Sequence, residues 1–277
     1  MDLYSTTSIA VSKTITKAYT SSFYAGMRLL KQEERKAILA IYGFVRVADE
    51  IVDTFHDADQ ESLLREYKKE TYRAIERGLS TNPVLHSYQW VVNTYRIDQE
   101  LTDNFFASME MDLVKNNHDK DSYTQYIFGS AEVVGLMCLS VFYAHDRDTY
   151  EELIQPARKL GEAFQKINFL RDIKSDLDDR NRVYFPGLDP RTFDLKTKQA
   201  IEKEIKSDFL KTLPGIRMLN RRVRWGVYLA YRYYLQLLLN IEKLSPEQLL
   251  SQRVSLPKRM KLLLLMKSFV RFRLGLI

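Results

Sequence analysis

Apolar residues recur at three- and four-residue spacings along most of the chain, which is the period of an amphipathic helix rather than of a strand. Polar or proline-containing breaks separate these segments at Asn82-Pro83, 116–121, 186–190 and Ser245-Pro246. The pattern therefore predicts an all-α protein. Its predicted helices cover residues 33–55, 61–77, 102–114, 122–145, 151–176, 197–207 and 211–244.

Composition supports this fold class. The 277 residues include 45% hydrophobic side chains, enough for a sizeable core, but 10 glycines and 7 prolines. These turn-forming residues are too few for the many short strands of a β-sandwich or barrel. No linker rich in Pro, Gly or Ser divides the chain, so we expect a single domain over residues 1–277.

Cellular location can be predicted from what the chain contains. Cys138 is the sole cysteine and cannot form an internal disulfide, which favours a reducing compartment. The first thirty residues do not resemble a secretory signal, and no segment approaches 18–20 uninterrupted apolar residues. We therefore expect a cytoplasmic protein that does not cross a membrane.

Charge is mildly basic, with a net charge of +6 and a pI near 9.1. Basic residues alternate with acidic ones and no nucleic-acid-binding motif appears, so we expect no nucleic-acid partner. Residues 253–277 differ, because they contain seven Lys or Arg and no acid. This segment predicts a basic amphipathic helix, which either packs on the core with a basic outer face or contacts an anionic membrane peripherally.

Two aspartates four residues apart, Asp49 and Asp53, fall on one face of the predicted helix 33–55, with Arg46 three residues before the first. Their neighbours in sequence are largely apolar, which raises the cost of desolvating two carboxylates. A single D-x-x-x-D pattern is common on solvated helix faces. By itself it does not indicate a site.

A second such pair, Asp172 and Asp176, changes this interpretation. At 100° per residue, Gln165 and Asn168 fall within roughly 60° of these aspartates and complete a polar stripe. Oxygen donors without His or Cys suit Mg²⁺, or alternatively Mn²⁺, rather than zinc. Two such helices facing each other predict a metal-assisted diphosphate site.

Arginines are available for the same anion. Guanidinium groups suit phosphate oxygens, and Arg46, Arg171 and Arg253 are the candidates. Arg171 lies off the polar stripe and is equally compatible with an ordinary surface or salt-bridge arginine. No phosphate-binding P-loop is present, which argues against nucleotide hydrolysis.

Small residues gather in the middle of the predicted helix 122–145, at Gly129, Ser130, Ala131 and Gly135. Such a cluster permits close helix packing, a ligand-lined wall, or both.

These motifs resemble those of the head-to-head prenyl synthases, a family that includes phytoene, squalene and dehydrosqualene synthases. Residues 42–53 resemble its first aspartate motif, and 168–176 followed by 182–186 resemble its second. Smaller matches lie at Ser22-Phe23, 129–135, 160–162, Tyr234 and Arg253-Val254.

The resemblance implies a class I isoprenoid synthase fold around a central apolar cavity. It implies Mg²⁺ at the catalytic aspartates and one amide, namely Asp49, Asp53, Asn168, Asp172 and Asp176. Further residues are expected to contact substrate: Tyr19, Ser21, Ser22, Phe23, Tyr42, Arg46, Gln165, Asn168, Arg171, Tyr234 and Arg253. The expected cavity wall includes Tyr126, Ser130, Val134 and Gly135.

By the same resemblance, two prenyl diphosphates would condense through a cyclopropylcarbinyl diphosphate. Residues 126–139 look most like bacterial phytoene synthases, which favours geranylgeranyl diphosphate as substrate and phytoene as product, without NADPH. The alternatives are squalene or dehydrosqualene formation from farnesyl diphosphate, and a non-catalytic scaffold. One departure stands out: relatives carry a lysine where this chain has Ser21, so Arg253 or another basic residue must do more.

Overall fold

The computed structural model describes residues 1–115, 117–180 and 182–277. Within these ranges the backbone forms helices and no sheet, with an isolated bridge between Asn117 and Val183. Asn116, the first residue of a predicted loop, lies outside the described residues. The helices are α1 (Leu3–Tyr19), α2 (Ser22–Met27), α3 (Gln32–Asp53), α4 (Gln60–Arg77), α5 (Pro83–Tyr95), α6 (Gln99–Val114), α7 (Lys120–Ile127), α8 (Val133–Phe142), α9 (Arg147–Asp178), α10 (Leu195–Lys211), α11 (Leu213–Met218), α12 (Arg221–Ile241), α13 (Pro246–Ser251) and α14 (Lys258–Arg273).

The predicted all-α class is confirmed, but the sequence pattern missed α1, α2, α5 and α13. The Asn82-Pro83 break marks the start of α5, because the Asn82 side chain accepts the backbone amides of Val84 and Leu85 at 3.0 and 3.4 Å. Pro83 occupies the first turn, where a missing N–H costs nothing. The predicted loop is present between Arg77 and Pro83, and its last residue, Asn82, caps the helix that follows.

The predicted helix 122–145 is present as a continuous helical stretch, Lys120–Phe142, with a π-helical turn at Phe128–Glu132 between α7 and α8. Two predicted boundaries were wrong. The predicted helix 211–244 is divided at Asn220, whose side chain caps α12 by accepting the Arg222 amide at 3.0 Å. The basic C-terminal helix begins only at Lys258, after an extended segment.

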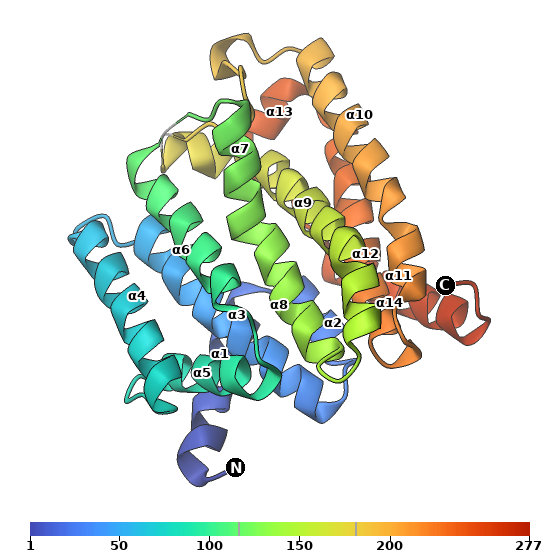
Figure 1. Ribbon diagram of the computed structural model, residues 1–277. Helices are drawn as coiled ribbons and strands as arrows, with labels where there is room; N and C mark the ends of the chain where they lie inside the picture. The colour runs from blue at the N-terminus through green and yellow to red at the C-terminus, as the bar shows by residue number, and fades with distance from the viewer. Residues whose placement is uncertain (116, 181) are drawn as a thin grey trace.

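Helices α8 and α9 run side by side through the centre of the molecule (Figure 1). Helix α8 also packs against α3 and α6, whereas α10, α12 and α13 pack against α9. The stretch Lys120–Phe142 has the length and mean hydropathy, 1.4, of a membrane span, but 56% of it is buried inside the molecule. Its central position in the bundle accounts for its apolar composition.

Close helix contacts at glycines shape the interior. A Cβ added at Gly226 of α12 would lie 2.8 Å from the Gly26 carbonyl oxygen of α2, so only glycine permits this approach. Gly161 of α9 approaches the Ala131 carbonyl in the same way. These contacts draw α2, α9 and α12 around one central space.

Candidate active site

A cavity of about 680 Å³ lies between α2, α3, α8, α9 and α12. The two aspartate pairs of its lining lie on the last turns of α3 and α9, whereas its apolar lining comes from earlier turns of these helices and from other segments, including α2 and α8. Ile38 and Asp53 of α3 are separated by about 22 Å at 1.5 Å per residue, so the two kinds of lining lie at different depths. The apolar lining includes Met27, Leu30, Ile38, Leu139, Phe142, Leu153, Leu160 and Leu219.

Both predicted aspartate pairs line this cavity. On α3, Asp49 lies 3.7 Å from the Arg46 guanidinium, which also pairs with Glu50 and stacks 4.3 Å above the Tyr19 ring. Asp53 accepts a hydrogen bond of 2.6 Å from Arg182. The α3 carboxylates are thus held by cations from within the bundle.

The predicted polar stripe on α9 is present, since its four members line the cavity. Asn168 accepts a hydrogen bond from the Tyr234 hydroxyl at 3.0 Å and donates one to Gln165 at 3.2 Å. Asp172 pairs with Arg171 and, at 2.6 Å, with Arg253.

Arg171 lies in the cavity lining with its side chain 23% exposed. Arg171 is thus a salt-bridge arginine, one of the two alternatives to a site residue, and it also lies in the cavity lining rather than on the outer surface. Pairing with the next residue in the chain draws it inward.

The pKa values of the aspartates differ, because burial and neighbouring arginines act on them to different extents. Burial raises the pKa of Asp49 to about 7 against the opposing charge of Arg46. Burial likewise raises the pKa of Asp176 to about 7, although Arg180 opposes it. Burial would also raise the pKa of Asp172, but hydrogen bonding and the charge of Arg171 outweigh it and lower the value. At Asp49 and Asp176 the neighbouring arginine thus does not offset the cost of burying the carboxylate.

Arg180 joins the two motifs. Its guanidinium lies 3.3 Å from Asp53 of α3 and 2.8 Å from Asp176 of α9. Among the described residues, no three acidic, His or Cys side chains converge as a ready metal cluster. The donors are nevertheless carboxylate and amide oxygens short of positive charge, and this donor set fits a hard divalent cation such as Mg²⁺.

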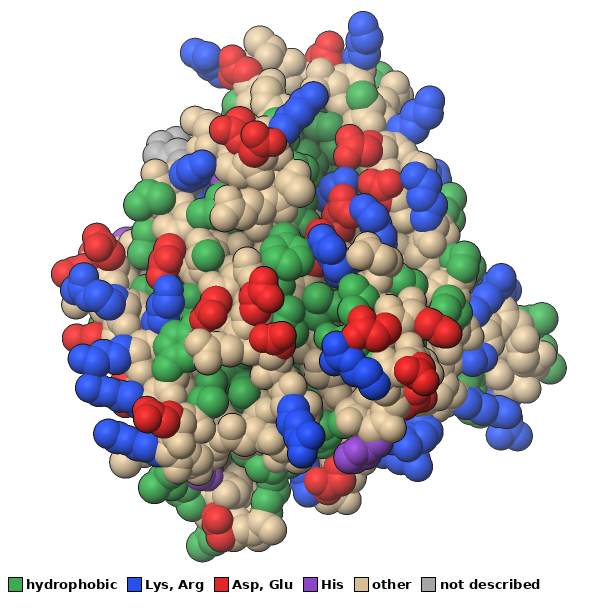
Figure 2. Space-filling model, in the orientation of Figure 1, with side chains coloured by type: hydrophobic (Ala, Val, Ile, Leu, Met, Phe, Trp, Pro, Cys, Tyr) green, Lys and Arg blue, Asp and Glu red, His purple; other side chains and the backbone are tan. Residues whose placement is uncertain are grey.

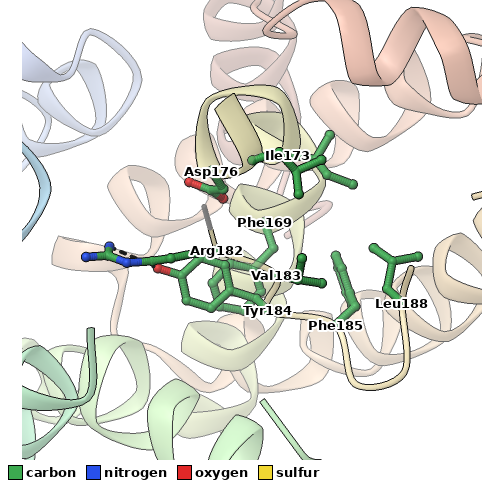
Figure 3. Close-up of a pocket in the computed structure, with 9 residues that line it drawn as sticks. Phe169, Ile173, Asp176, Arg182, Val183, Tyr184, Phe185 and Leu188 are labelled. Atoms are coloured by element: carbon green, nitrogen blue, oxygen red, sulfur yellow. Dashed lines mark hydrogen bonds between the residues drawn. The ribbon is translucent and has the colours of Figure 1, made fainter. Parts of the chain in front are cut away.

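A buried network behind Asp53 escaped the sequence analysis. Asp112 of α6 accepts hydrogen bonds from Tyr126 at 2.8 Å and Tyr184 at 3.0 Å. Arg182 donates to the Asp112 and Val52 carbonyl oxygens, each at 2.9 Å. Figure 3 shows Arg182 beside Tyr184 in a small pocket that Asp176 also lines. The 182–186 motif gave a signal for Arg182 and Tyr184, but no pattern marked Asp112.

The remaining predicted residues divide between the lining and the rim. Lining positions are occupied by Tyr19, Phe23, Tyr42, Tyr126, Ser130, Val134, Gly135 and Tyr234. Ser21 and Ser22 are outside the lining, and Ser21 accepts a hydrogen bond from Lys261. Gly129 packs instead against α6, where a Cβ would meet the Asn104 carbonyl at 2.2 Å. The small-residue cluster thus serves both close packing and the cavity wall.

Known proteins resemble this chain in sequence and fold. The squalene/phytoene synthase family model matches residues 16–260. A phytoene synthase of Arthrospira platensis is 26% identical over 96% of this chain and 94% of its own. A presqualene diphosphate synthase of Rhodopseudomonas palustris is 30% identical over 61% of this chain and 60% of its own.

A solved dehydrosqualene synthase shares the fold. Its TM-score is 0.84 at 19% identity, covering 97% of this chain and 98% of that chain. The predicted class I isoprenoid synthase fold is confirmed.

Proposed function

The chain belongs to the squalene/phytoene synthase family, and on this premise we propose that it joins two molecules of geranylgeranyl diphosphate head to head to give phytoene, a step of carotenoid biosynthesis. Members of the family are prenyltransferases, and this chain is an enzyme of that class. The observation that carries the proposal is the pair of aspartate motifs on α3 and α9, which line one end of a deep apolar cavity and are joined through Arg180.

The polar end of the cavity suits diphosphate binding and departure. Asp49, Asp53, Asn168, Asp172 and Asp176 would hold Mg²⁺, which when bound supplies positive charge for the departing diphosphate. Three arginines of the lining would bind the same oxygens through paired donors: Arg46, Arg171 and Arg253. Mn²⁺ is the alternative metal, and the proposed reaction needs no NADPH.

The apolar end suits the prenyl chains. Side chains such as Leu153 and Phe142 would hold the hydrocarbon and exclude the water that quenches a carbocation. Tyr42 and Tyr234 lie between the two ends, and their rings can stabilise positive charge through their faces. The first condensation would give a cyclopropylcarbinyl diphosphate, and its ionisation, rearrangement and proton loss would give the triene.

Relatives of nearly full coverage favour the twenty-carbon substrate. The Arthrospira platensis protein and a Synechocystis protein, 26% identical over 94% of this chain, are both phytoene synthases. A 4,4'-diapophytoene synthase of Staphylococcus haemolyticus is 25% identical over 70% of this chain. Farnesyl diphosphate is therefore the competing substrate.

The test is incubation of purified protein with Mg²⁺ and either geranylgeranyl or farnesyl diphosphate, with and without NADPH, followed by mass analysis of the hydrocarbons. We expect a C40 triene without NADPH. A C30 product would overturn the choice of substrate. Intact diphosphates in every incubation would overturn the enzymatic proposal and favour a scaffold.

We also propose that α14 contacts an anionic membrane surface, where a water-insoluble product can leave. Its inner face packs on α12, with Trp225 stacked on Phe272. Its outer face is more apolar than predicted, since Leu262, Met266 and Val270 are 59%, 60% and 53% exposed. Lys and Arg side chains flank these residues at the projecting C-terminal end of the molecule (Figure 2). Apolar anchors with basic neighbours are typical of interfacial helices.

Sedimentation with phosphatidylglycerol vesicles and with phosphatidylcholine vesicles tests this contact. We expect binding to the anionic vesicles and a loss of binding in the double variant Met266→Gln, Val270→Gln. Equal binding by the variant would contradict the contact, and dimerisation through this face would assign it to a second copy of the chain.

A further inference from the structure

A lysine from the C-terminal helix lies where the motif around Ser21 lacks one. The Lys261 ammonium donates a 2.5 Å hydrogen bond to the Ser21 hydroxyl across 240 residues of sequence. Thr20 and Phe23, on either side of the Ser21-Ser22 pair, line the cavity. Lys261 therefore stands at the rim of the cavity rather than on the outer face of α14.

The fold fixes Lys261 in this position. Its backbone carbonyl accepts a hydrogen bond from the Tyr233 hydroxyl of α12 at 3.1 Å. About two turns further along α14, Ser268 accepts a hydrogen bond from the Trp225 indole at 3.3 Å. The neighbouring Tyr234 of α12 points the other way and bonds Asn168 in the cavity. Helix α12 thus contacts Lys261 of α14 on one side and lines the cavity on the other.

Lys261 lacks a carboxylate partner among the described residues. Lys166, which is buried, instead pairs with Glu162, Glu204 and Asp208, and the buried Lys198 pairs with Glu202. Structural lysines in this chain are thus satisfied by acids. Lys261 is the exception in this comparison, since its side-chain partner is a neutral hydroxyl.

The surroundings of Lys261 carry excess positive charge. Burial and the charge of Arg171 both lower the pKa of Lys261, which places the two cations within electrostatic reach. Arg171 and Arg253 share a single carboxylate, Asp172. Lys261, Arg171 and Arg253 thus form a group of cations on one side of the polar end, and such a group can bind an anion.

We propose that Lys261 is a further substrate-positioning residue, which binds the diphosphate of one prenyl substrate together with Arg171 and Arg253. Its ammonium takes the place of the lysine that is absent at position 21. This inference rests on the proposed function only for the identity of the substrate, because diphosphate recognition can be measured separately. Helix α14 then contributes to the site itself as well as to the outer surface.

Calorimetric titration with inorganic diphosphate in Mg²⁺-containing buffer tests the proposal. We expect Lys261→Met to weaken binding about tenfold, the scale of one charge-assisted hydrogen bond. Lys261→Gln, which retains a hydrogen-bond donor but no charge, should weaken it similarly, whereas Lys261→Arg should retain most of it. Lys267→Met removes an exposed charge from the same helix and should change nothing.

The most discriminating experiment moves the positive charge from position 261 to position 21. The double variant Ser21→Lys, Lys261→Met should recover diphosphate binding, which a purely structural role of Lys261 would not allow. In the synthase assay, Lys261→Met should raise KM more than it lowers kcat. Thermal unfolding of each variant should stay near that of the wild type, because the Tyr233 bond uses the backbone of residue 261.

Three results would overturn the inference: wild-type affinity in Lys261→Met and Lys261→Gln, an equal loss in Lys267→Met, or no diphosphate binding by the wild-type chain. Failure of the proposed function looks different. In that case diphosphate binding would still depend on residue 261, while neither prenyl diphosphate would yield a hydrocarbon.

Discussion

The two aspartate pairs have the same four-residue spacing but different electrostatic surroundings. On α3, Asp53 is held by Arg182, which is only 5% exposed. On α9, Asp172 is held by Arg253, whose side chain is 66% exposed. Arg182 beside the α3 pair is thus part of the interior, whereas Arg253 beside the α9 pair stands at the rim, within reach of a ligand.

This difference assigns different work to similar motifs. A buried arginine that also bonds two backbone carbonyls stabilises the fold around α3 and α6. Arg171 and Arg253 share one carboxylate, that of Asp172, and therefore retain hydrogen-bonding capacity for an anion. We infer that the α3 pair mainly offers carboxylates to the metal, while the α9 pair stands beside the stronger diphosphate site.

The largest expected effect is on catalysis and should be common to both pairs. Asp49→Asn and Asp172→Asn each remove a carboxylate from the metal-binding end of the cavity. We expect each to lower the rate of hydrocarbon formation by about 10²–10³-fold, the scale of one preorganised electrostatic contact. The matched control is Asp178→Asn, which changes an exposed aspartate at the end of α9. Near-normal activity in either motif variant would contradict the prediction that both aspartate pairs take part in catalysis.

The next largest effect is on the free energy of unfolding, and it should differ between Arg182 beside the α3 pair and Arg253 beside the α9 pair. Arg182→Met leaves Asp53 and Asp112 buried without their cation, so we expect a loss of about 3 kcal/mol in the free energy of unfolding. Arg253→Met loses a largely exposed ion pair, for which the expected loss is below about 1 kcal/mol. Chemical denaturation measures both, with the exposed Arg191→Met as control.

Equal losses in the arginine variants would contradict the contrast between an interior cation and a rim cation. The reverse pattern is expected for diphosphate affinity, which should fall in Arg253→Met. Arg182→Met should change that affinity little if the variant remains folded, because Arg182 bonds residues on the far side of Asp53.

Features of the site that depend on residues close in sequence could be predicted from the sequence, whereas those that depend on the packing of distant segments could not. The α9 stripe was predictable because spacing within one helix determines which residues share a face. Arg171 was harder to interpret, since its direction depends on pairing with Asp172 and on Tyr234 from another helix. Lys261 was not identified at all, because its position relative to Ser21 depends on how α14 packs on α12.

The same reasoning explains the errors in the fold. Helices α1 and α5 pack against α3 and each other, but polar residues and an early proline weakened their pattern. The Asn82 cap resembles a loop signal until its side chain is seen to bond the following amides. Asp112 had no motif, because its partners Tyr126 and Tyr184 come from two other segments of the chain.

The smallest expected effect is a pH dependence of stability, and it treats the two pairs alike. In metal-free protein, the raised pKa values of Asp49 and Asp176, each about 7, mean that the folded state binds more protons than the unfolded state between about pH 4 and 7. Stability should therefore fall as the pH rises from 6.5 to 7.5, by about 1–2 kcal/mol for the two aspartates together. The lowered pKa of Asp172 acts in the opposite sense, but below this pH window.

Mg²⁺ should reverse this trend, because a metal binds the ionised carboxylates and stabilises the folded state most at the higher pH. Thermal unfolding at both pH values, with Mg²⁺ and with a chelator, measures the effect. Asp49→Asn should flatten the metal-free trend, whereas the exposed Asp121→Asn should leave it unchanged. If the metal-free protein instead gained stability toward pH 8, the rim and interior arginines would already neutralise all four aspartates, and the metal would have to displace one of them.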